Sequence, residues 1–139
     1  MSARRAVDVV VGLIGDSSGR WLVNCRPPGT PLAGSWEFPG GKTRPGEAAF
    51  AALARELDEE LGIEVFEAEP VLVLEHDYPD KRVRLDVWHV VKFRGRATPR
   101  EGQPLRWVTA AECLDLPLLP ADGPIVARLA SLGASSEVP

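Results

Sequence analysis

Three glutamates within five residues are the part of this chain whose types and spacing could do chemistry. Glu56, Glu59 and Glu60 stand at positions i, i+3 and i+4, so a helix would place the three carboxylates on one face. Like charges at this spacing destabilise an isolated helix by about 0.2–0.5 kcal/mol per pair. A divalent cation bound through oxygen ligands would remove that repulsion. Taken alone, the three residues fit a metal-binding face and a solvated acidic face equally well.

The glutamates lie within a longer motif. Residues 41–63 read GKTRPGEAAFAALARELDEELGI. This string resembles the Nudix box, in which a glycine is followed after five residues by a glutamate and, after seven more, by Arg-Glu-aliphatic-x-Glu-Glu-x-Gly-aliphatic. Every fixed position is filled, by Gly41, Glu47, Arg55, Glu56, Leu57, Glu59, Glu60, Gly62 and Ile63. A match at so many specified sites within 23 residues is very improbable by chance.

The resemblance implies hydrolysis of a nucleoside diphosphate linked to another group, with water attacking phosphorus. It also implies an α/β/α sandwich, with a mixed central β-sheet and flanking helices. The implied cofactor is Mg²⁺, with Mn²⁺ as the alternative, because a bound metal neutralises phosphate charge and lowers the pKa of a bound water. Glu56 and Glu60 are then expected to be direct metal ligands, and Glu59 a ligand or the general base. The Gly40 carbonyl is a further ligand by family precedent.

Three other residues of the motif receive supporting roles. Arg55 is spaced to pair with Glu59 one helical turn later or to orient Glu47, so we expect it to organise the catalytic carboxylates. Gly41, together with the preceding glycine, lets the backbone turn closely before the helix.

The likeness extends beyond the box and narrows to MutT-type enzymes. Residues 36–42 read WEFPGGK, 76–81 read HDYPDK, 100–107 read REGQPLRW and 120–125 read PADGPI. These blocks are similar to the lead-in, later blocks and base-reading segment of bacterial MutT proteins, and similarity covers about residues 9–129. MutT proteins hydrolyse 8-oxo-dGTP to 8-oxo-dGMP and pyrophosphate, which prevents misincorporation into DNA. For this chain the resemblance favours attack at the β-phosphorus.

Four roles outside the box follow from the same resemblance, position by position. Glu101 matches a loop glutamate that completes the metal site or acts as the base. Arg26 matches an arginine that contacts the nucleotide, and Phe38 falls where the base pocket would be lined. Lys81 is expected to meet phosphate or another part of the substrate. Each residue also has a plainer reading, as an exposed charge or, for the aromatic ring, as part of the core.

Asp122 departs from the MutT pattern, which commonly has asparagine at this position. An asparagine side chain both donates and accepts hydrogen bonds, which suits the O6 acceptor and the N7–H donor of 8-oxoguanine. An ionised aspartate only accepts. Either burial holds Asp122 protonated, or the preferred base presents an amino group, as cytosine does. A related branch, the CTP pyrophosphohydrolases, is similar in its own Pro-Ala-Asp-x-Pro segment. Asp122 also suits a helix N-cap.

Three functions follow. The favoured one is a Mg²⁺-dependent nucleoside triphosphate pyrophosphohydrolase that removes 8-oxo-dGTP from the nucleotide pool. The alternative is the same chemistry on CTP, dCTP or modified cytosine nucleotides. A distant third is a catalytically silent Nudix domain that senses nucleotides, which the intact set of box glutamates disfavours.

Length and composition restrict the domain organisation, the partners and the location that we expect for this chain. The 139 residues suit one domain, predicted to span residues 1–133 with 134–139 as a flexible C-terminal tail. A net charge of −4 argues against a broad grip on nucleic acid, so the expected partner is a nucleoside triphosphate. No apolar run approaches the roughly 20 residues that cross a bilayer. Cys25 and Cys113 lack metal-ligand spacing, which favours a reduced cytoplasmic protein. The sequence leaves monomer and homodimer open.

The elements that position these residues follow from periodicity. Apolar runs at 7–14 and 20–26 predict a hairpin around a turn cluster, and runs at 71–78 and 82–93 predict a second. Between them Glu47 is expected to open the box helix, with Phe50 on its core-facing stripe and Gly62 as its stop.

Two shorter features complete the expected fold. Residues 105–108 predict a strand, and Thr109 and Glu112 have the spacing of a capping box. Asp122 is expected to begin a last helix.

Overall fold

Residues 6–139, the described part of the chain in this computed structural model, form two β-sheets with helices on either side. The larger sheet is mixed and has the strand order β4–β1–β6–β5. Along this path the strands are β1 (Ala6–Leu13), β4 (Gly40–Lys42), β5 (Glu64–Asp77) and β6 (Arg82–Arg94), and a fifth strand, β8 (Ser136–Glu137), pairs with β6. Strands β1 and β6 run parallel, whereas β1–β4 and β5–β6 are antiparallel. The mixed sheet confirms this part of the predicted fold class.

The smaller sheet is antiparallel and has the order β3–β2–β7. It consists of β2 (Arg20–Cys25), β3 (Trp36–Glu37) and β7 (Leu105–Thr109). The first predicted hairpin is confirmed only at its turn, where Gly15 and Trp21 form an antiparallel bridge and the Asp16 and Leu22 N–H groups donate to the Arg20 and Ile14 carbonyls. Beyond the turn, β1 and β2 belong to different sheets. Two adjacent apolar runs with a turn between them look like a hairpin in sequence, and only tertiary pairing separates them. The second hairpin is confirmed as β5–β6.

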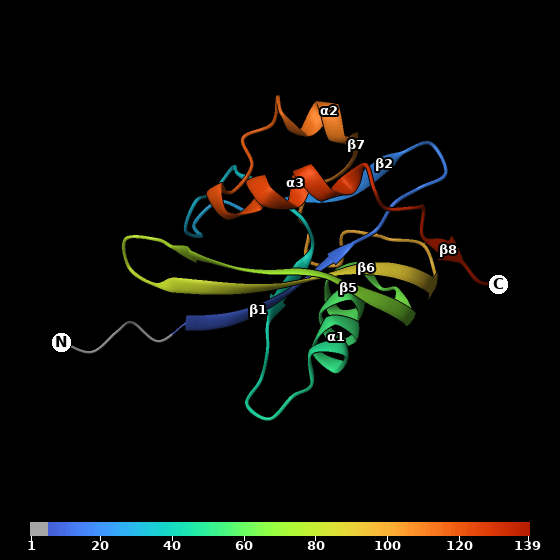
Figure 1. Cartoon of the computed structure of the whole chain (residues 1–139), viewed down its shortest axis with the longest axis horizontal. Helices are drawn as coiled ribbons and strands as arrows, with labels where there is room; N and C mark the ends of the chain where they lie inside the picture. Colours follow the sequence, from blue (N-terminus) through green and yellow to red (C-terminus); the bar gives the residue numbers. More distant parts are fainter. Residues whose placement is uncertain (1–5) are drawn as a thin grey trace.

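Helices cover both faces of the larger sheet, which gives the expected α/β/α arrangement (Figure 1). Helix α1 (Ala49–Leu61) packs on one face. The other side carries α2 (Ala110–Cys113), the 3₁₀ turn η1 (Pro120–Asp122) and α3 (Gly123–Leu129). Each side has its own hydrophobic core, and neighbouring β1 residues Val10 and Val11 point into different cores because strand side chains alternate. Within the described residues no helix is long and apolar enough to cross a membrane.

The box helix differs from its prediction at its start. It begins at Ala49 rather than Glu47, and Phe50 is 36% exposed instead of facing the core. Leu53, Leu57 and Leu61 are fully buried. Gly62 ends the helix as expected, in the left-handed conformation (φ 72°) with its N–H donating to the Asp58 carbonyl.

The C-terminal segment, predicted as a flexible tail at 134–139, contains a short strand. Ser136–Glu137 form β8, which pairs in parallel with β6. The Ser135 hydroxyl donates to the Val90 carbonyl (2.6 Å) and accepts from the Gly15 N–H (3.1 Å). A serine within a polar terminal stretch gives no sequence signal for such pairing.

Candidate active site

Arg55 organises the exposed end of the box. Its guanidinium donates to both Glu47 carboxylate oxygens at 2.8 Å, to Glu56 at 2.9 Å and to the Lys42 carbonyl at 3.1 Å. A weaker contact reaches Glu59 at 3.4 Å. The Arg55 hydrogen bonds hold the pKa of Glu47 at about 2, with a further contribution from the Arg44 backbone N–H. Arg55 thus makes both of the contacts expected of it, and Glu47 ties the loop before the helix to the helix itself.

The surroundings of Glu60 disfavour the charged form of its carboxyl group. Burial, followed by the nearby charge of Glu56, raises its pKa to about 8, while a hydrogen bond from the Gly40 N–H (3.1 Å) opposes the shift. The charges of Glu101 and Glu37 raise the pKa further. Three acidic side chains from three different segments therefore act on Glu60, and the described residues supply it with only one short-range donor.

Two glycines before the box helix, Gly40 and Gly41, leave room for this arrangement. Gly40 pairs with Val11 across the β1–β4 ladder, and an added Cβ there would overlap the Val10 carbonyl oxygen. A Cβ at Gly41 would overlap the Glu56 carboxylate. Gly40 therefore requires glycine for close packing, and a side chain at Gly41 would displace the Glu56 carboxylate.

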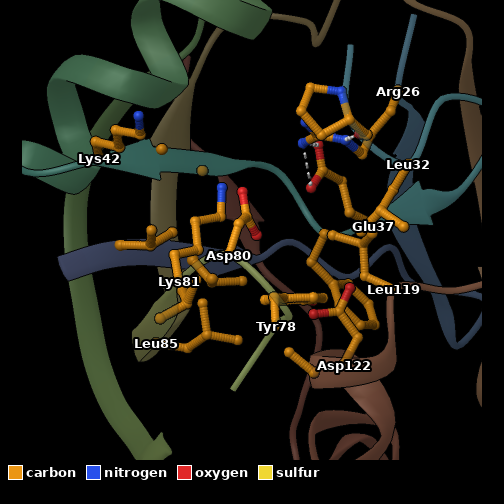
Figure 2. Close-up of a pocket in the computed structure, with 18 of the residues that line it drawn as sticks. Arg26, Leu32, Glu37, Lys42, Tyr78, Asp80, Lys81, Leu85, Leu119 and Asp122 are labelled. Carbon is orange, nitrogen blue, oxygen red and sulfur yellow. Dashed lines mark hydrogen bonds and ion pairs between the residues drawn. The ribbon is translucent and has the colours of Figure 1, made fainter. Parts of the chain in front are cut away.

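A pocket of about 590 Å³ opens beside Glu60. Its walls come from β1, β4, the β5–β6 turn, η1 and the loop after β2, and Figure 2 shows its charged residues converging from these segments. The pocket brings together Arg26, Phe38, Gly40, Gly41, Glu60, Lys81 and Asp122. The other predicted site residues do not line it; they are Glu47, Arg55, Glu56, Glu59 and Glu101. Glu60 thus links the box to the pocket.

Asp122 lines the pocket and is the last of its lining residues in the sequence. It is only 4% exposed, and its Oδ2 atom is buried without a hydrogen-bond partner among the described residues. Burial, with a contribution from the charge of Glu37, raises the pKa of Asp122 to about 8, and a hydrogen bond from the Phe38 backbone N–H opposes the shift. The carboxyl makes no cap hydrogen bond to α3, so the expected side-chain N-cap is wrong. Asp122 is turned into the pocket instead.

Glu37 is a pocket residue that sequence reasoning missed. Both of its carboxylate oxygens lie 3.4 Å from Arg26 Nη1, and Figure 2 shows the pair at the same end of the pocket as Asp122. Burial raises the pKa of Glu37, and Arg26 partly offsets that effect. Arg26 is itself held by a 2.6 Å hydrogen bond from Nε to the Pro31 carbonyl. The available signal was a charged residue between two aromatic residues, Trp36 and Phe38.

Comparison with known proteins identifies the family. The NUDIX domain matches residues 10–128, most of the chain. The chain belongs to the Nudix family. A CTP pyrophosphohydrolase from Escherichia coli (strain K12) is 38% identical over 131 residues, which cover 94% of this chain and 96% of the relative. An 8-oxo-dGTP diphosphatase from the same organism is 31% identical over 128 residues, covering 92% and 99%.

Solved structures agree with this assignment. A MutT protein from Methanosarcina mazei Go1 superposes with a TM-score of 0.82 at 25% identity, covering 94% of this chain and 97% of that one. The α/β fold of this chain is therefore the Nudix fold of MutT structures, and the protein is a Nudix hydrolase.

Nudix hydrolases generally need a divalent metal ion. Over residues 6–139 no three acidic, histidine or cysteine side chains already form a metal-binding group. The donor chemistry nevertheless fits such an ion, because Glu56, Glu60 and Glu101 offer oxygen ligands and the charges of Glu56 and Glu101 both act on Glu60. An added cation would lower the raised pKa of Glu60.

Glu59 is the box glutamate that the Nudix fold places apart from the others. Its side chain is 45% exposed and contacts Arg55 at 3.4 Å and Arg44 at 3.6 Å. It faces these two arginines outside the pocket, whereas Glu60 lines the pocket wall.

Proposed function

We propose that this MutT-type Nudix hydrolase is a Mg²⁺-dependent nucleoside triphosphate pyrophosphohydrolase that converts 8-oxo-dGTP to 8-oxo-dGMP and pyrophosphate. The observation that carries this proposal is the buried Asp122 carboxyl at one end of a pocket whose other wall includes Glu60. The base would bind near Asp122, and the phosphates would extend toward the box.

A neutral Asp122 offers the hydrogen bonds that 8-oxoguanine needs. With a pKa of about 8, the carboxyl is mostly protonated at neutral pH. Its O–H can donate to O6 and its carbonyl oxygen can accept from N7–H. Unmodified guanine presents acceptors at both O6 and N7, so one of the two contacts would set acceptor against acceptor. This pairing supports selection against dGTP.

Glu37 supplies a second reading group that suits guanine. Held by Arg26, it accepts hydrogen bonds and lines the pocket. Guanine bases carry hydrogen-bond donors at N1 and N2 beside O6, and the Glu37 carboxylate would accept from these donors. Cytosine carries only one donor group, the N4 amino group, on its base-pairing edge. Glu37 therefore favours an oxidised guanine over a cytosine nucleotide.

The box end would hold the metal and the phosphates. Glu56, Glu60 and Glu101 would bind the ion, with the Gly40 carbonyl as a further ligand, and Arg55 would orient Glu56. When bound, the ion neutralises phosphate charge and activates water for attack on phosphorus. Lys81 lines the pocket and would contact the phosphates as a point charge. Glu59, held by Arg44 and Arg55, would act through these neighbours or as the general base.

The cytosine alternative rests on a specific finding, the similarity to a CTP pyrophosphohydrolase over nearly the whole chain. An ionised Asp122 would accept from the N4 amino group of cytosine, and a neutral one would also match N3 and N4. The chemistry at the box would be unchanged, so the two functions differ only at the base.

Pyrophosphate release with Mg²⁺ from 8-oxo-dGTP, dGTP, CTP, dCTP and 5-methyl-dCTP tests the proposal. We expect kcat/KM for 8-oxo-dGTP to exceed that for dGTP by about 100-fold or more, because a buried polar mismatch is strongly rejected. Equal values for these two would contradict the proposed base recognition. Higher values for the cytosine nucleotides would assign the protein to the alternative.

A further inference from the structure

The loop that carries Glu101 completes the C-terminal end of α1. The last carbonyls of a helix have no partner within the helix. Here the Thr98 N–H donates to the Leu61 carbonyl at 2.9 Å, and the Arg100 N–H donates to the Glu60 carbonyl at 3.1 Å. The loop therefore depends on the same helical turn that presents the Glu60 side chain.

Gln103 joins these two parts with its side chain. Its Nε2 donates to the Glu60 carbonyl at 3.1 Å, and its Oε1 accepts from the Glu101 N–H at 3.0 Å. The residue is only 4% exposed although it is polar. Both halves of the amide are used, one toward each of two residues that we propose as metal ligands. No other glutamine occurs in the chain.

We propose that Gln103 is a positioning residue that fixes Glu101 relative to Glu60, so that their two carboxylates are presented to one divalent cation. This inference rests on the metal-binding role proposed above for Glu60 and Glu101. The two carboxylates already influence each other electrostatically, and Glu101 itself lies on an exposed loop. Without the bridge, the backbone at Glu101 would lose its hydrogen bond to the amide that reaches the helix end.

Substitutions at Gln103 separate its two contacts. Gln103→Met keeps the length and removes both hydrogen bonds, whereas Gln103→Glu keeps an acceptor for the Glu101 N–H and loses the donor to the Glu60 carbonyl. Thr98→Val is the matched control. The Thr98 hydroxyl contacts the Leu61 carbonyl at 3.4 Å, on the same loop and helix end, but does not touch Glu101.

The first test is Mn²⁺ affinity, measured by electron paramagnetic resonance. Partners that orient metal ligands typically contribute 10- to 100-fold to affinity, so Gln103→Met should weaken binding by about 10-fold and Thr98→Val should leave it unchanged. Glu101→Gln should weaken binding as well. If Gln103 acts through Glu101, the double variant should bind no more weakly than Glu101→Gln alone. Additive losses, or wild-type affinity in Gln103→Met, would overturn the proposal.

A second test needs no metal. Hydrogen exchange of the Glu101 amide in the metal-free protein should accelerate at least 10-fold in Gln103→Met and remain slow in Gln103→Glu. Unchanged exchange in Gln103→Met would overturn the positioning role. Failure of the wild-type protein to bind Mn²⁺, with accelerated exchange in the variant, would instead refute the proposed metal site while upholding the bridge from Gln103 to Glu101.

Discussion

Two regions of the candidate active site shift the pKa values of their carboxyl groups in opposite directions. At the exposed edge of the box, Arg55 bonds to Glu47, Glu56 and Glu59, and the pKa of Glu47 falls to about 2. At the base end, Asp122 is buried beside another acid, and its pKa rises to about 8. Ionised carboxylates suit metal and phosphate chemistry, whereas a neutral carboxyl can donate a hydrogen bond. One residue type therefore serves reaction chemistry at one end and base recognition at the other.

Glu60 stands at the junction of the two ends, lining the pocket and interacting with Glu56 and Glu101. Glu60→Gln should lower kcat by about 1,000-fold or more, because it removes a proposed metal ligand while keeping the side chain's shape. The thermal melting temperature at neutral pH should stay the same or rise, since a carboxyl whose pKa is raised by folding destabilises the folded state above about pH 4.5. Steady-state kinetics with Mg²⁺ and thermal melting measure the two effects. Substantial activity in a folded variant would refute the metal-ligand assignment.

Substitution of Asp122 tests base recognition separately from the chemistry at the box. Asp122→Ala should lower kcat/KM for 8-oxo-dGTP by about 10- to 100-fold, the worth of a bidentate base contact, with a much smaller effect on dGTP. Asp122→Asn is the matched control, because an amide keeps one donor and one acceptor. Activity on both nucleotides should be compared across the three proteins. An equal loss on 8-oxo-dGTP and dGTP would mean that Asp122 supports the fold and does not read the base.

Arg55 tests whether the box end depends on its ion pairs. Arg55→Lys retains the charge but cannot form the paired contacts to Glu47, so kcat should fall by about 10-fold. The Glu47 pKa, lowered from 4.5 to about 2, makes a contribution to stability that is present above about pH 4.5 and lost as the pH falls toward 2. Urea unfolding from pH 6 to 3 should show this contribution reduced in the variant. The same pH dependence in both proteins would contradict the pairing.

Local patterns in the sequence predicted the box end well. Helical spacing placed the glutamates and Arg55 on α1, and Gly62 ends that helix by the expected left-handed cap. The capping box at Thr109 and Glu112 is likewise confirmed, because both of its hydrogen bonds connect residues three apart.

The base end depends on contacts that are distant in sequence. Asp122 was a plausible N-cap by local chemistry, and its burial against Phe38 and Glu37 brings together segments more than 80 residues apart. Glu37 acquires its role from Arg26 across the β2–β3 pairing. The separation of β1 and β2 into different sheets also depends on long-range pairing. No periodicity in a single sequence encodes these partners.

The pH dependence of activity on 8-oxo-dGTP tests most directly whether a neutral Asp122 reads the base. The quantity is kcat/KM for 8-oxo-dGTP between pH 6.5 and 9.5 in the wild-type protein, divided by the same value for Asp122→Asn. Titration of Glu60 and ionisation of the nucleotide affect both proteins and cancel in this ratio. The ratio should stay constant below about pH 7.5 and fall by up to about tenfold per pH unit above 8, as Asp122 loses its proton. A ratio that stays flat across the range would contradict base recognition by a protonated Asp122.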